Sequence, residues 1–77
     1  MTYKEKEVIY QEIKRAMEKQ ILECEIGTRY CQRAKISGKP SLDVQSQLQK
    51  LENIYKDTKI ALEEKIDIIE DELEHIK

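Results

Sequence analysis

Apolar residues in the first half of the chain recur at alternating steps of three and four positions. The row consists of Tyr10, Ile13, Met17, Gln20, Cys24, Gly27, Cys31 and Ala34. This spacing places the row on one side of an α-helix and is typical of coiled-coil packing. Because Thr2 and Glu5 fit a capping box, we predict a helix from about residue 3 to about residue 36. Gln20 is the polar member of the row, and buried polar residues of this kind set the register of paired helices.

A second row follows a similar spacing in the other half of the chain. It consists of Val44, Leu48, Leu51, Tyr55, Thr58, Leu62, Ile66, Ile69, Leu73 and Ile76. Two successive steps of four meet at Leu62, and such a stutter locally relaxes a left-handed supercoil. We predict a second helix from about residue 42 to about residue 77, with the two rows facing each other. The residues assigned to this hairpin seam are Ile13, Met17, Cys24, Cys31, Leu48, Leu51, Tyr55, Leu62 and Ile69.

Glycine and proline cluster only between the two rows, in Ser37-Gly38-Lys39-Pro40-Ser41. Gly38 suits the position after a helix C-cap, Pro40 cannot continue a helix, and Ser41 is a good N-cap. A connection this short makes the two helices antiparallel neighbours. We therefore predict one all-α domain over residues 1–77, a long antiparallel two-helix hairpin with coiled-coil-like packing. Gly27 lacks a side chain and would let the facing helix approach closely.

Both predicted helices carry apolar residues outside these rows. Those at regular helical spacing are Leu22, Ile26 and Tyr30 in the first helix, with Val8 in the same sector, and Ile54, Ala61 and Ile68 in the second. A two-helix hairpin hides one face of each helix, whereas a four-helix bundle needs broader apolar faces. We therefore predict that these residues form a second interface, used for dimerisation into a four-helix bundle or for another protein. The alternative is that they are flanking residues, partly covered by the stems of neighbouring side chains.

Charged residues are unevenly distributed along the predicted hairpin. The basic residues near the turn are Arg29, Arg33, Lys35 and Lys39, and the acidic residues near the open end are Glu63, Glu64, Asp67, Glu70, Asp71, Glu72 and Glu74. Two hairpins packed antiparallel place each basic turn beside an acidic open end, whereas parallel packing juxtaposes like charges. We therefore expect an antiparallel homodimer, and we expect another protein as a further partner.

The composition and residue spacing are not those expected of a membrane-spanning, secreted or zinc-binding protein. The 77 residues include 14 basic and 16 acidic side chains, which give a net charge of −2, and 39% are hydrophobic. No stretch approaches the ~18 apolar residues of a membrane span, and no signal-peptide core is visible. Cys24 and Cys31 are too far apart on a helix for a disulfide and do not have the spacing of a zinc site. We expect a cytoplasmic protein with reduced thiols, of bacterial or phage origin, with no metal and no membrane partner.

The sequence lacks the pattern of a catalytic site. The single histidine, His75, falls near the end of the second predicted helix, where a surface position is expected. Ser37-Gly38-Lys39 is not a phosphate-binding loop, because the upstream glycine and the preceding strand are missing. We therefore predict a non-enzymatic protein without a cofactor or small-molecule substrate. Its predicted function is protein–protein interaction, as a small adaptor, inhibitor or assembly factor that presents apolar and charged helix faces.

Nucleic-acid binding is the alternative function. The candidate contacts are Arg29, Tyr30, Arg33, Lys35 and Lys39, all near the predicted turn. Arginine and lysine neutralise phosphates, and an exposed tyrosine can stack on a base. Four cations are few, however, and the acidic open end interrupts any continuous basic track along the hairpin.

Overall fold

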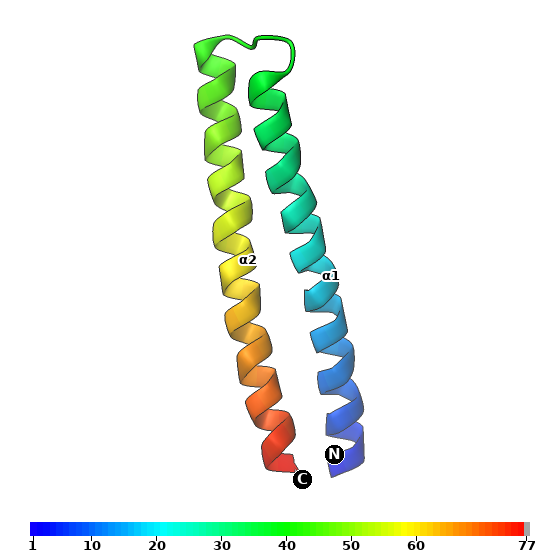
Figure 1. Ribbon diagram of the computed structural model, residues 1–77. Coiled ribbons are helices and arrows are strands. Elements are labelled where there is room, and N and C mark those ends of the chain that lie inside the picture. Colours follow the sequence, from blue (N-terminus) through cyan, green and yellow to red (C-terminus); the bar gives the residue numbers. More distant parts are fainter. Residues whose placement is uncertain (77) are drawn as a thin grey trace.

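The computed structural model describes residues 1–76, and this part of the chain is entirely helical apart from its start and one turn. Helix α1 (Tyr3–Ile36) and helix α2 (Leu42–Ile76) lie side by side, and the start of α1 and the end of α2 lie near each other, far from the turn (Figure 1). The hairpin measures 56 × 15 × 14 Å. The prediction of an all-α chain with two long helices is therefore confirmed, and Lys77, the predicted end of the second helix, lies outside the described residues.

Local capping fixes where α1 begins and ends. The side chain of Thr2 accepts a hydrogen bond of 3.2 Å from the backbone N–H of Glu5, and the Thr2 carbonyl accepts one of 3.0 Å from that of Lys6. These bonds satisfy backbone donors that have no partner within the first turn. At the other end, the Ser37 N–H donates to the Arg33 carbonyl at 2.8 Å, and the chain then leaves the helix.

The turn depends on residues that adopt left-handed backbone conformations. Gly38 has a φ of +73°, as expected of a glycine directly after a C-cap, and Lys39 follows with a φ of +49°. The side chain of Ser41 then accepts a hydrogen bond from the Val44 N–H at 3.4 Å and caps α2. Gln45 adds a side-chain hydrogen bond of 3.0 Å to the Pro40 carbonyl, so the turn is tied to the first turn of α2.

Each helix faces the other with one regular row of residues, which we call the seam. The seam of α1 consists of Tyr10, Lys14, Met17, Ile21, Cys24, Thr28, Cys31 and Lys35, and the seam of α2 consists of Gln45, Leu48, Glu52, Tyr55, Lys59, Leu62, Ile66, Ile69, Leu73 and Ile76. In α2 every buried or half-buried residue belongs to this row, and in α1 the only others are its neighbours Glu25, Gly27 and Ala34. Both rows keep the alternation of three and four steps throughout, as a heptad repeat requires.

The seam of α2 differs from the predicted row because polar residues replace apolar ones. Glu52 and Lys59 face α1, whereas their neighbours Leu51 and Thr58 are exposed. The predicted stutter at Leu62 is therefore wrong, since the repeat is unbroken there. The physical reason is that Glu52 and Lys59 have partners of opposite charge on α1, which offset the cost of placing their charges in the seam.

The seam of α1 also differs from the predicted row, at every second position of the row: it contains Lys14, Ile21, Thr28 and Lys35 where Ile13, Gln20, Gly27 and Ala34 were predicted. Ile21 is half-buried, and Gln20 is exposed. Gln20 is therefore not a buried register-setting residue. The charged seam residues Glu52 and Lys59, which pair with α1, set the register instead.

The apolar core of a single hairpin is small. Among residues 1–76, the only buried apolar side chains are Cys24, Cys31, Leu62 and Ile69, and Cys31 alone is completely buried. A pair of helices with so few buried apolar groups gains little from burial, and chains of this size often associate to gain more.

Candidate interaction surface

The polar contacts that join α1 to α2 in residues 1–76 converge on one side of the hairpin. They are Lys14–Glu70 at 3.1 Å, Glu25–Lys59 at 3.1 Å, Gln32–Glu52 at 3.5 Å, Lys35–Gln49 at 2.6 Å and Lys35–Glu52 at 2.7 Å. Lys35–Glu52 joins two seam residues. In each of the other contacts, one partner is a seam residue, and the other comes one position after a seam residue of the facing helix. We call this side the polar flank, and its members outside the seam are Glu18, Glu25, Gln32, Gln49, Lys56, Glu63 and Glu70.

Glu52 is the centre of the polar contacts. Its side chain is 4% exposed, and its two carboxylate oxygens lie 2.7 Å from the Lys35 Nζ and 2.8 Å from the Lys56 Nζ. The hydrogen bond from Lys35, followed by that from Lys56, lowers the pKa of Glu52 from 4.5 to about 2, although burial acts in the opposite direction. A buried carboxylate between two ammonium groups stays charged at neutral pH and holds the two helices in one register.

The other two ion pairs extend this register along the hairpin. Glu25 pairs with Lys59, and Lys14 pairs with Glu70. The two pairs are separated by the same number of residues on both helices, as expected for an antiparallel pair in one constant register. The hydrogen bond to Glu25 raises the pKa of Lys59. These side chains are partly exposed, so each pair contributes less to stability than to the choice of register.

The opposite side of the hairpin carries exposed apolar side chains from both helices. We call it the apolar flank, and its members are Ile9, Ile13, Tyr30, Val44, Leu51, Ile54, Ala61 and Ile68. Successive residues of a helix are rotated by about 100°, so residues just before and just after the seam point to opposite sides. Because the polar contacts place the polar sides of both helices together, the apolar sides also share one flank. The large members are 37% to 64% exposed.

The six residues predicted as a second interface do not share one surface. Tyr30, Ile54, Ala61 and Ile68 lie on the apolar flank, whereas Leu22 lines a shallow groove on the polar flank with Glu18 and Glu63 among others. Ile26 lies on the outer side of α1, away from α2. All six are exposed in the single chain.

The predicted seam residues separate into two groups. Seven lie between the helices, namely Met17, Cys24, Cys31, Leu48, Tyr55, Leu62 and Ile69. Ile13 and Leu51 are 39% and 37% exposed and lie on the apolar flank. Sequence reasoning assigned Ile9 to neither interface and placed Val44 in the row that faces the first helix, whereas both lie on the apolar flank. The signal that could have revealed them is the charge pairing of Glu52 and Lys59, which fixes the seam one position further along α2.

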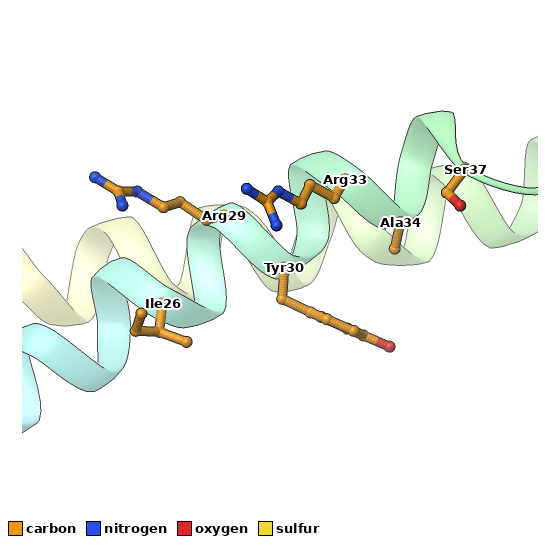
Figure 2. A pocket seen from close by; sticks show the side chains of 6 residues that line it. All are labelled: Ile26, Arg29, Tyr30, Arg33, Ala34 and Ser37. Carbon is orange, nitrogen blue, oxygen red and sulfur yellow. The ribbon is translucent and has the colours of Figure 1, made fainter.

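A second surface feature lies on α1 near the turn. Ile26, Arg29, Tyr30 and Arg33 line a shallow groove, together with Ala34 and Ser37 (Figure 2). The two arginine side chains extend to one side of the helix, and Ile26 and Tyr30 extend to another (Figure 2). Of the other predicted nucleic-acid contacts, Lys39 is exposed in the turn, whereas the ammonium group of Lys35 is already occupied by Glu52.

The described residues include two cysteines and one histidine, the side chains most often found in metal and redox sites. Across residues 1–76, no three His, Cys, Asp or Glu side chains are placed to hold a metal ion, and both thiols are free and buried. His75 is exposed, and its Nδ1 lies 2.6 Å from the Asp71 carbonyl oxygen, a hydrogen bond that raises the pKa of the imidazole. Neither helix, as far as it is described, combines the length and apolar character needed to cross a membrane.

Comparison of the chain with protein-family models, curated proteins and solved structures finds no match. The two flanks and the groove near the turn are therefore the candidate functional surfaces.

Proposed function

We propose that this chain is a non-enzymatic protein–protein interaction module and that the apolar flank is its binding surface. The observation that carries this proposal is the division of the hairpin into two unlike sides. One side holds the polar contacts between the helices and exposes Leu22 and Ile60, whereas the other holds none of these contacts and exposes seven large apolar side chains. A cluster of exposed apolar side chains on one side of a small protein is typical of an interaction site.

The mechanism is occupancy of a partner surface by a preformed pair of helices. Ile54 and Ile68 lie on one line of α2, and Tyr30 of α1 lies at the level of Ile54 in the register that the ion pairs define. Side chains at such helical spacing insert into a groove or between the helices of a partner. Because the ion pairs of the polar flank hold the hairpin together, its residues need little ordering when they bind, which favours affinity. Adaptor, inhibitor and assembly-factor roles all use this mode of action.

The test compares aspartate substitutions on the two sides of α2. Ile54→Asp and Ile68→Asp place a charge on the apolar flank, and Ile60→Asp is the matched control on the other side. The three isoleucines are 59%, 62% and 55% exposed, so the substitutions perturb the single hairpin alike. We expect the first two variants to weaken self-association and binding of a purified partner by about tenfold or more, equivalent to ~1.4 kcal/mol.

The control should retain both activities, and circular dichroism should show that all three variants remain helical. Partners are obtained by capture on the immobilised chain from a lysate of its host, and each is then purified and tested for direct binding. If Ile54→Asp and Ile68→Asp bind every partner as the wild-type chain does, the apolar flank is not the binding surface.

Nucleic-acid binding is the second candidate function, favoured by the groove near the turn. Arg29 and Arg33 lie one helical turn apart, and Tyr30 is 64% exposed beside them. This combination suits contact with a phosphate and an unpaired base. The pairing of Lys35 with Glu52 leaves fewer free cations for this purpose than the sequence suggests.

A further inference from the structure

We propose that a second copy of this chain covers the apolar flank and that the two hairpins pack face to face in antiparallel orientation. This inference rests on the proposed function, because it names the partner of the same surface. Such a pair is a four-helix bundle with a twofold axis at right angles to the hairpins, and each copy contributes the same residues to the interface.

The size of the flank fits an interface of this kind. One face of the hairpin, 56 Å long and 15 Å wide, offers about 800 Å², which matches the ~800 Å² per partner of a stable protein–protein interface. A copy of the same hairpin has the same length, so it covers the flank from end to end. Two flanks in contact also enlarge the apolar core, which in one hairpin contains only four buried apolar residues among those described.

Charge determines the orientation. Residues 29–50 carry five basic side chains and one acidic side chain, whereas residues 4–15 and 63–74 at the open end together carry five basic and ten acidic side chains. The turn end of the hairpin is therefore positive and the open end is negative. Antiparallel packing brings each positive turn end to the level of the partner's negative open end, and parallel packing brings like charges together.

The orientation makes a geometric prediction about two positions on the flank. In an antiparallel pair the twofold axis passes near the middle of α2, so Ala61 lies close to its own counterpart. Val44 is about fifteen residues from that middle, so at a rise of 1.5 Å per residue the two copies of Val44 are roughly 45 Å apart. In a parallel pair, each residue of α2 lies at the same level as its counterpart in the other copy. The separation along the helix is then the same for Ala61 and for Val44.

Cysteine cross-linking with a short bismaleimide distinguishes these arrangements. Ala61→Cys and Val44→Cys are made separately in the full chain, and the wild type is the control because Cys24 and Cys31 are buried. We expect Ala61→Cys to give cross-linked dimer and Val44→Cys to give at least about tenfold less, as the separation along the helix dictates. Sedimentation equilibrium of the wild type should give twice the 9.2 kDa mass of one chain.

Each contrary result overturns a different statement. Equal cross-linking at the two positions refutes the antiparallel orientation. A wild-type chain that remains at 9.2 kDa up to millimolar concentration refutes the second copy as the occupant, but the proposed function stands if Ile54→Asp still abolishes binding of another protein. If neither Ile54→Asp nor Ile68→Asp weakens the dimer, the apolar flank is not the dimer interface. That result refutes both the second copy as the occupant of the flank and the assignment of the flank as the binding surface.

Discussion

The aromatic ring of Tyr55 packs directly against the backbone of Gly27. A methyl group added at Gly27 would lie 2.5 Å from the Tyr55 Cζ and 2.7 Å from both Cε atoms, closer than carbon atoms can approach. The glycine therefore provides the space in which the ring crosses from α2 to α1. This contact explains why a residue of poor helix propensity occurs in the middle of α1.

Gly27→Ala should destabilise the hairpin although alanine is the better helix former. The gain in helix propensity is about 1 kcal/mol, whereas displacing a packed ring costs ~1–3 kcal/mol. We expect a net loss of about 1 kcal/mol in the free energy of unfolding, measured by urea denaturation at fixed protein concentration. In a Tyr55→Ala background, the same substitution should stabilise the chain by about 1 kcal/mol. An equal effect in both backgrounds would show that the ring does not constrain residue 27.

The carboxylate of Glu52 should control stability in acid. Its pKa is about 2 in the folded chain against 4.5 for an unperturbed glutamate, so the folded state favours the charged form. The resulting stabilisation is complete above about pH 4.5 and is lost progressively as the pH falls from there toward 2. The measurement is the free energy of unfolding between pH 2 and 6. Glu52→Gln should be less stable at pH 6 and should show a flatter dependence in this range, whereas Glu64→Gln, at an exposed position, should keep the wild-type slope.

Leu62 should be among the most sensitive positions to truncation. It is buried in the seam, and Leu→Ala substitutions at such sites cost ~2–5 kcal/mol because they leave a cavity. We expect Leu62→Ala to lower stability by about 2 kcal/mol, the lower end of this range, because the hairpin is narrow and can partly collapse. Leu42→Ala is the matched control, since Leu42 is 82% exposed and the change should stay within ~0.5 kcal/mol. Similar losses at the two positions would contradict the assigned core.

The thiols of Cys24 and Cys31 should be protected in the folded chain. Both side chains are buried, and Cys31 is 0% exposed. Alkylation by a maleimide therefore requires the helices to separate, so its rate reports opening of the hairpin. We expect slow labelling in buffer and a steep increase with urea, followed by mass spectrometry. Rapid labelling of Cys31 without denaturant would mean that the two helices are not stably paired.

Substitution of the two arginines near the turn tests the alternative function. If the groove binds nucleic acid, Arg29→Glu combined with Arg33→Glu should abolish binding, and wild-type affinity should fall steeply with salt. If the groove has no such role, filter binding at low salt should show no retention of RNA or DNA by the wild-type chain. Lys50→Glu, near the turn but on α2 and outside the groove, is the control.

The local structure of this protein follows from short-range signals in its amino-acid sequence. Two helices and a turn were predicted from Thr2, from residues 37–41 and from the apolar repeat. These signals are readable in the sequence because caps, glycine and proline act through neighbouring atoms. The close approach at Gly27 was also predictable, since a glycine within an otherwise apolar row marks a point of contact.

Which of two adjacent rows on each helix faces the other helix depends instead on contacts between the two helices. Either Leu51 or Glu52 can lie in the seam of α2, and hydrophobicity alone favours Leu51. Glu52 takes the position because Lys35, on the other helix, supplies a charge at 2.7 Å, and this term does not exist until the helices meet. The choice also turns Leu51 outward, so the same ion pair that fixes the register creates the apolar flank that the protein presents.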